Sequence, residues 1–265
     1  MQFEPKDLFE KLEFDKIIDL TVKECLGELG VAAVQNIRPS TDLATIKQSL
    51  AEVAEMRLSI EENDRFPGSA YQEINEELKM LDISGYVLAE EGLQRINTIL
   101  LQTRDIFAFF KPEKRELYPH LYQIIQSVTF DESLIEEIEK VIDEEGNIRP
   151  DASPELARIR RAVNSKQREL DRVFRGIIQE YRGKGMLTDN VESFRNGRRV
   201  LSVPAEYKRQ VRGIIHDESA SGKTTFIEPE RVIEINNDIF DLHQKEKREI
   251  YRILRELSAL LKPYI

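Results

Sequence analysis

The chain has 265 residues, of which 40% are hydrophobic, with 12 Gly and 10 Pro, so it can bury the core of one large domain or two modest ones. One third of the residues are charged and Trp is absent, a composition typical of long solvated helices and not of a β-sandwich. The single cysteine, Cys25, excludes disulfide and cysteine-cluster metal chemistry and favours a cytoplasmic protein. The sequence shows neither an export signal nor a run of about 18 apolar residues, so no membrane partner is expected.

Charge is unevenly distributed along the chain. The net charge of -10 argues against nucleic acid if it is taken as a single number, because neutralising phosphates requires clustered Lys and Arg. Residues 154–227, however, hold 16 Lys or Arg against 9 Asp or Glu, a balance of +7, so the other 191 residues sum to -17. The basic segment is therefore the place to look for an anionic partner.

Helical periodicity fills the first half of the chain and predicts a helical core domain over residues 1–150. The expected helices cover residues 7–30, 43–60, 85–111, 113–127 and 132–142. The second of them carries an apolar stripe made of Leu43, Ile46, Leu50, Val53, Met56 and Ile60. Because every helix has such a stripe, we expect the helices to pack on one another.

A domain boundary is expected near residues 145–153, followed by a long helix. Ser153 is a suitable N-cap, and Pro154 occupies the tolerated first helical position. One apolar stripe continues to about Arg182: Leu156, Ile159, Val163, Leu170, Val173 and Ile177. At about 1.5 Å per residue this helix would be roughly 45 Å long, which is an arm and not a core helix.

Residues 185–229 change to short β-type runs separated by glycines. Asn196-Gly197 lies between two such runs and is a strong hairpin signal, because both residues tolerate positive φ. Helical periodicity resumes after Pro229. The fold expected is mostly α: a helical core, then two long antiparallel helices (151–184 and 230–265) with a small antiparallel β insert (185–229) at their tip.

The segment SASGKTTF resembles the end of a phosphate-binding loop but lacks two of its requirements. The first glycine of such a loop would fall on Asp217, an anion, and the loop would have to open into a helix, whereas TTFIEP is β-like. An ordinary turn is expected, with Lys223 available for a backbone contact. His216, Asp217 and the nearby serines are too crowded in sequence for a nucleophilic triad, so no catalytic residue is assigned.

The β insert and the adjoining helix carry a cluster of basic residues. The candidate nucleic-acid-binding residues are Arg195, Arg198, Arg199, Lys208, Arg209, Arg212, Lys223, Arg182 and Lys184, with Arg175 further along the helix. Such side chains can neutralise phosphates without reading bases. The alternative is that these charges only protect a solvated sheet edge against aggregation. Nucleic-acid-binding surfaces often place aromatic residues among the cations, and here there are only Phe194 and Tyr207, so this alternative stays open.

The string RNGRRVLSVPAEYKRQVRGIIHDESASGKTTFIEP, together with the opening LEFDKIIDL, resembles one family. It is similar to the second branch of the bacterial MutS family, the MutS-like proteins without a mismatch-reading domain. Arg195 to Arg198, Pro204 to Tyr207 and Gly213 to Pro229 carry the similarity. The layout of the whole chain agrees with it, although Arg209 to Arg212 depart from the more usual proline-containing turn.

This resemblance implies a core domain, two lever helices and a clamp at their tip. It implies further that the whole protein is a homodimer with an ATPase domain that uses ATP and Mg²⁺, and that it commonly ends in an endonuclease domain. Members bind branched DNA and restrain recombination, and some act on collided ribosomes, so rRNA is a possible partner. Since the chain stops at Ile265, we expect this segment itself to have no cofactor and no enzymatic activity.

Two functions remain open from the sequence. In the first, the levers and clamp hold a nucleic-acid backbone while the missing ATPase moves them. In the second, the segment is an interaction module that docks on a protein or ribosomal surface, without direct contact to DNA. A nucleotide-binding enzyme that uses Lys223 is a third and weaker alternative, because the phosphate-binding loop is incomplete.

Overall fold

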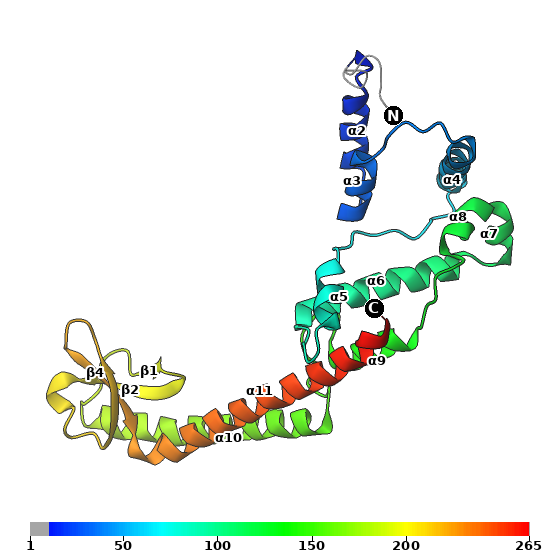
Figure 1. Ribbon diagram of the computed structural model, residues 1–265. Helices are drawn as coiled ribbons and strands as arrows, with labels where there is room; N and C mark the ends of the chain where they lie inside the picture. Colours follow the sequence, from blue (N-terminus) through cyan, green and yellow to red (C-terminus); the bar gives the residue numbers. More distant parts are fainter. Residues whose placement is uncertain (1–10, 265) are drawn as a thin grey trace. The chain divides into compact units, whose positions relative to one another are not determined.

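A computed structural model describes residues 11–264, which are mostly helical with one four-stranded antiparallel sheet, as expected (Figure 1). The chain divides into two compact units. Unit 1 contains the chain up to Ile148 together with the residues from Leu254 onward, and unit 2 is Arg149–Ile253. Among the described helices, none combines the length and the apolar content needed to cross a bilayer.

The helices of unit 1 differ from the predicted ranges in three ways: two expected helices are broken, the helix expected over 85–111 begins only at Glu90, and a further helix covers 75–82, where a polar loop was expected. They are α2 (Phe14–Lys23), α3 (Glu28–Gln35), α4 (Leu43–Glu61), α5 (Asn75–Asp82), α6 (Glu90–Phe109), α7 (Pro112–Leu117), α8 (Pro119–Ile125) and α9 (Ser133–Val141). The expected helix over 7–30 is interrupted before Gly27, the N-cap of α3, and its first residues lie outside the described part. The helix over 113–127 is split at Pro119, which lacks the amide hydrogen that a continuous helix needs.

An aromatic cluster lies under α7 and α8. Phe110 and Tyr118 are buried there, with Phe66 and Phe109 packed beside them. The Tyr118 hydroxyl donates a hydrogen bond to the Asp64 carboxylate. Burial, reinforced by this bond, raises the pKa of Tyr118 to about 12.

The apolar stripe of α4 is only partly covered. Met56 packs against the aromatic cluster, as expected. Leu43, Leu50, Val53 and Ile60, in contrast, are between 63% and 71% exposed, so the expectation that each whole stripe is packed is wrong for this helix. Helical periodicity identifies an apolar face but does not determine what lies against it.

The end of the chain belongs to unit 1. Helix α11 (Ile233–Leu261) starts in unit 2, and its last residues, followed by the short 3-10 turn η3 (Lys262–Tyr264), pack in unit 1. There the Ser258 hydroxyl accepts a hydrogen bond of 3.0 Å from the Leu88 amide, and the Lys262 ammonium donates to the Asp82 carbonyl at 2.8 Å. One continuous helix therefore contributes to both units.

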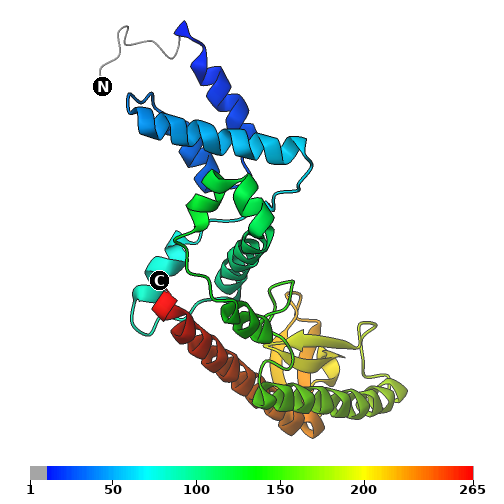
Figure 2. The ribbon, with the colours of Figure 1, turned by 90° about the vertical axis from the view of Figure 1, so that its right-hand side faces the viewer.

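Two long helices form the frame of unit 2, α10 (Pro154–Gly183) and the first part of α11 (Figure 2). Ser153 caps α10 as predicted, accepting from the Leu156 amide at 3.0 Å. Three side-chain contacts join the helices: Ser153 with Glu249 (2.6 Å), Arg160 with Glu246 (2.7 Å) and Lys166 with Asp238 (2.9 Å). Along these three contacts the residue number rises on α10 and falls on α11, so the two helices are antiparallel, as expected.

The β insert consists of two hairpins. Its strands are β1 (Glu192–Arg195), β2 (Arg198–Pro204), β3 (Gly213–Glu218) and β4 (Thr224–Pro229), in the order β1-β2-β4-β3 with every pair antiparallel. Asn196 and Gly197 form the predicted turn between β1 and β2, with φ of 52° and 74°. Short 3-10 turns precede β3 (η1, Ala205–Tyr207) and α11 (η2, Glu230–Val232).

One face of the sheet packs on the two long helices, at the end where α10 stops and α11 begins. Leu201, Val203 and Ile227 supply the sheet side of this core. The helices supply Leu170, Phe174, Ile177, Val232, Ile235 and Ile239. The core fixes the insert on the helix pair, so the orientation of its basic residues follows from the fold of unit 2.

Candidate nucleic-acid interface

The predicted basic residues fall into two groups by their contacts within residues 11–264. Five are engaged in ion pairs: Arg195, Arg198, Arg199, Lys208 and Lys184. Four are exposed and have no ion pair or side-chain hydrogen bond within the described residues: Arg182, Arg209, Arg212 and Lys223. We call this second group the distal cations. Of the nine predicted residues, these four alone have no carboxylate partner within residues 11–264.

Arg198 belongs to a buried polar cluster around Glu228. The Glu228 side chain is completely buried and accepts hydrogen bonds from Arg198 (2.9 Å) and Asn236 (2.7 Å), with the His216 ring nitrogen 2.6 Å from its second oxygen. His216 lies at a β-bulge, where the register of β3 shifts between Ile215 and Asp217. The cluster therefore ties three strands to the start of α11.

Arg195 lies flat across the sheet. Its guanidinium is 3.7 Å from the centre of the Phe226 ring, and its Nε donates to Asp217 at 3.1 Å. His216 and Asp217 are thus each paired with another residue, Glu228 and Arg195, and the serines take part in neither pair.

Arg199 fixes the other face of the sheet to α10. Its guanidinium lies 4.6 Å from the centre of the Phe174 ring and donates two hydrogen bonds to Glu192, of 2.8 and 3.0 Å. It also pairs with Asp171 of α10. The side chain is only 14% exposed, so most of its hydrogen-bonding capacity is already used inside unit 2. A role of Arg195, Arg198 and Arg199 in binding stays a prediction.

Lys223 lies in a tight loop between β3 and β4. The loop is closed by hydrogen bonds from the Thr224 amide to the Ser219 hydroxyl (3.0 Å) and from the Gly222 amide to the Ser219 carbonyl (2.7 Å). Thr224 opens a strand and not a helix, so the segment is a hairpin loop, as expected. The Lys223 carbonyl accepts from the Ala205 amide at 2.9 Å, which brings this loop beside η1.

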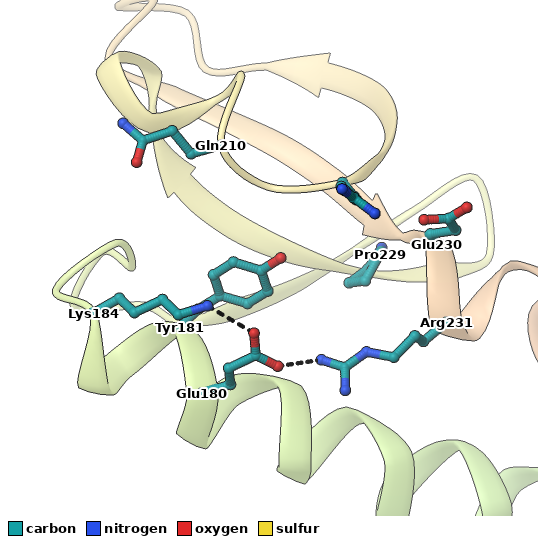
Figure 3. Close-up of a pocket in the computed structure, with 8 residues that line it drawn as sticks. Glu180, Tyr181, Lys184, Gln210, Pro229, Glu230 and Arg231 are labelled. Carbon is teal, nitrogen blue, oxygen red and sulfur yellow. Dashed lines mark hydrogen bonds and ion pairs between the residues drawn. The ribbon is translucent and has the colours of Figure 1, made fainter.

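A hollow of about 480 Å³ lies where the loop after η1 meets the end of α10 (Figure 3). Its lining residues are Glu180, Tyr181, Lys184, Gln210, Arg212, Pro229, Glu230 and Arg231. Glu180 accepts from both Lys184 (2.8 Å) and Arg231 (2.6 Å), and these hydrogen bonds lower the pKa of its carboxyl group. Arg212 therefore lies beside the end of α10, whereas Lys223 lies at the other end of β4, next to η1.

Several exposed arginines of α10 were not among the predicted residues. Arg161, Arg168 and Arg172 share this helix with Arg175 and Arg182. Their regular spacing is visible in the sequence and could have indicated them. A hollow lined by Arg168, Arg172 and Arg175, together with Ser165, Glu169 and Asp171, marks this part of the surface.

The histidines outside the insert contact carboxylates. His120 is 2.6 Å from Glu55, whose oxygens also accept the backbone amides of His120 and Leu121, and His243 is 3.2 Å from Glu246. In the described part of the chain, no three His, Cys, Asp or Glu side chains are grouped so as to hold a metal ion.

Curated relatives resemble nearly the whole chain, although no protein-family model matches it. Endonuclease MutS2 of Symbiobacterium thermophilum is 34% identical over 254 residues, which cover 94% of this chain and 31% of that protein. Endonuclease MutS2 of Halothermothrix orenii is 31% identical over 262 residues, with coverages of 96% and 33%. That of Lactococcus lactis subsp. lactis is 32% identical over 261 residues, with coverages of 98% and 33%.

The chain spans about a third of the length of the curated relatives it matches. The alignments extend through the helices of unit 1 as well as the motif-rich β insert, because they cover at least 94% of this chain. The resemblance first indicated by the RNGR, PAEY and FIEP segments is thereby confirmed. The chain belongs to the MutS2 family.

Proposed function

We propose that this chain forms a nucleic-acid-binding segment of a MutS2 protein and that it contacts the phosphate backbone without reading bases. The relatives are named endonucleases. In recombination or repair, which the family resemblance implies for the whole protein, this segment would hold the DNA. ATP and Mg²⁺, which the family resemblance implies for the whole protein, would act in a domain other than the described residues. ATP-driven movement of that domain would shift the helix pair of unit 2 and strengthen or weaken its contact with the phosphate backbone.

The observation that carries the proposal is the set of distal cations. Arg182, Arg209, Arg212 and Lys223 are exposed and have no carboxylate partner within residues 11–264, although the chain as a whole carries a net charge of -10. An exposed cation with no partner can release the counterions of a phosphate at little desolvation cost. Cations on loops and at a helix end can contact the phosphate backbone of a nucleic acid, because such contact does not require a protein element to enter a DNA groove.

The internally paired arginines have a supporting role in this proposal. Arg198 neutralises the buried Glu228, and Arg199 holds the sheet to Phe174 and Asp171 of α10. Replacing them would disturb the insert as well as its charge, so loss of binding in such variants would be ambiguous. The distal cations allow a cleaner test because their side chains are solvent-exposed.

The test replaces three distal cations, Arg209→Gln, Arg212→Gln and Lys223→Gln, in the 265-residue chain. Binding to a fluorescently labelled DNA duplex is measured by anisotropy between 50 and 200 mM salt. If each cation neutralises one phosphate, the slope of log K against log salt becomes less steep by roughly 2.7, at about 0.9 per phosphate. We expect Kd at 100 mM salt to rise at least tenfold, on the order of the loss of three contacts.

A matched control removes the same charge elsewhere. Lys247→Gln, Arg248→Gln and Arg255→Gln lie on exposed positions of α11 and lower the net charge by the same three units. This control should change Kd less than threefold, which is less than about 1 kcal/mol. Equal weakening by the two triple variants would show that only overall charge matters and would contradict the proposed contact.

A further inference from the structure

Five arginines recur along one side of α10. Arg161, Arg168, Arg175 and Arg182 are spaced by seven residues, and Arg172 lies between two of them. At 3.6 residues per turn, a step of seven advances about two turns and returns to nearly the same side, so all five fall within roughly 80° of the helix surface. We call these residues the arginine row.

The arginine row lies opposite the buried side of α10. Ile159, Val163, Leu170, Phe174 and Ile177 are buried among the residues of unit 2. The arginines of the row are all exposed. Because the core holds the helix by its other side, the row cannot turn inward without unpacking unit 2.

The carboxylates of α10 are all paired with cations outside the row. Glu155 pairs with Arg158 at 2.7 Å and Glu169 with Lys166 at 3.1 Å. Asp171 pairs with Arg199, and Glu180 with both Lys184 (2.8 Å) and Arg231 (2.6 Å). Within the described residues, no ion pair reaches the row, so five positive charges remain uncompensated along the helix.

Three members of the row repeat the same local contact. The Nε of Arg161, Arg168 and Arg175 donates to the carbonyl oxygen four residues earlier, at 3.1, 3.2 and 3.2 Å. This bond restrains each guanidinium on the helix surface and leaves its two Nη groups for another acceptor. Guanidinium groups bind phosphate oxygens in a bidentate manner, and the row contains no lysine.

From these observations we propose that the arginine row binds the phosphate backbone of a nucleic-acid duplex along α10. The inference rests on the proposed function and adds a second contact to the distal cations. The 21 residue steps from Arg161 to Arg182 rise about 32 Å, close to one turn of B-DNA at about 34 Å. Arg182 belongs to both sets, so the row continues into the distal cations.

The composition of the row favours a phosphate backbone over a membrane. Between the arginines lie polar residues such as Asn164, Ser165 and Gln179, all exposed. A helix that lies on a lipid surface needs large apolar side chains beside its cations, and this side of α10 has none among its exposed positions. An acidic protein surface remains the competing ligand and is an arm of the test.

The test compares Arg168→Gln, Arg172→Gln and Arg175→Gln with the distal triple variant and the α11 control triple variant. A DNA duplex of about 30 base pairs serves as the probe, and poly-glutamate of equal total charge serves as the competitor. The row variant should bind at least tenfold more weakly at 100 mM salt, with a salt slope less steep by roughly 2.7. Thermal melting should remain unchanged, since the replaced side chains are exposed.

The outcomes separate this inference from the proposed function. A row variant that binds like the α11 control, while the distal variant is weakened, would overturn the arginine row and leave the proposed function intact. Competition by poly-glutamate as effective as competition by unlabelled duplex would overturn the assignment of a phosphate ligand. Absence of duplex binding by the unaltered chain at 50 mM salt would overturn both proposals.

Discussion

Glu228 and Arg198 illustrate how burial determines the role of a charged residue. The Glu228 side chain has no exposed surface, whereas Arg198 is 24% exposed. A buried carboxylate is tolerated only when hydrogen bonds replace the water it has lost, and Arg198, Asn236 and His216 supply them. The main role of Arg198 is therefore to stabilise the insert.

A prediction follows for Arg198. Arg198→Met should lower the free energy of unfolding by about 3 kcal/mol, because removal of one partner leaves the charge of Glu228 buried and uncompensated. The double variant Arg198→Met with Glu228→Gln should recover a large part of this loss. Urea denaturation followed by circular dichroism measures both values.

Arg209→Met provides the control for this measurement, because Arg209 is exposed and belongs to the same insert. Its effect should stay below about 0.5 kcal/mol, the range of ordinary surface substitutions. If Arg198→Met were no more destabilising than Arg209→Met, the account of the buried cluster would be wrong.

At the scale of elements, features set by short-range sequence could be predicted. The cap at Ser153, the turn at Asn196-Gly197 and the extent of α10 depend on residues within a few positions of one another, and all three are confirmed. The periodic apolar residues also indicated the right side of α10 for burial. These signals are local, so they do not need the tertiary fold.

The pairing of the insert's arginines could not be predicted in the same way. Arg195 on β1 reaches Asp217 on β3, 22 residues away, across β2 and β4, and this contact depends on the strand order of the folded sheet. The exposed stripe of α4 is a second example, since its coverage depends on the placement of other helices. The arginine row, in contrast, was readable from its seven-residue spacing and was missed.

The start of α10 provides a pH-dependent prediction at this scale. Glu249 of α11 accepts a bidentate pair of hydrogen bonds from Arg252 (2.7 and 2.9 Å) and one from Ser153, the N-cap of α10 (2.6 Å). The hydrogen bonds from Arg252, followed by that from Ser153, lower the pKa of Glu249 to about 2 from an ordinary 4.5. The lowered pKa means that the charged form is favoured in the folded protein.

Stability from a lowered carboxyl pKa is fully present above the unfolded value and is lost as the pH falls through the folded value. The Tm of the unaltered chain should therefore exceed that of Glu249→Gln by a large margin at pH 7. This Tm difference should shrink as the pH falls from about 4.5 to about 2. Thermal melting across this range measures it. Glu234→Gln, an exposed change on α11, should leave Tm unaltered at each pH; a constant difference for Glu249→Gln would contradict the linkage.

At the scale of the whole molecule, the two units differ in charge. Unit 2 carries 22 Lys or Arg against 17 Asp or Glu, a net +5, and unit 1 carries 17 against 32, a net -15. The distal cations and the arginine row together hold eight positive charges that form no ion pair within the described residues. A net acidic protein can therefore present a basic surface, which the overall charge conceals.

The salt dependence of duplex binding tests the central claim most directly. The 265-residue chain is titrated with two DNA duplexes of equal length and unrelated sequence between 50 and 200 mM salt. Contact with the backbone through several cations predicts the same Kd for both duplexes and a linear fall of log K with log salt, at about 0.9 per phosphate. Binding that is insensitive to salt, or that differs tenfold between the two sequences, would contradict the account.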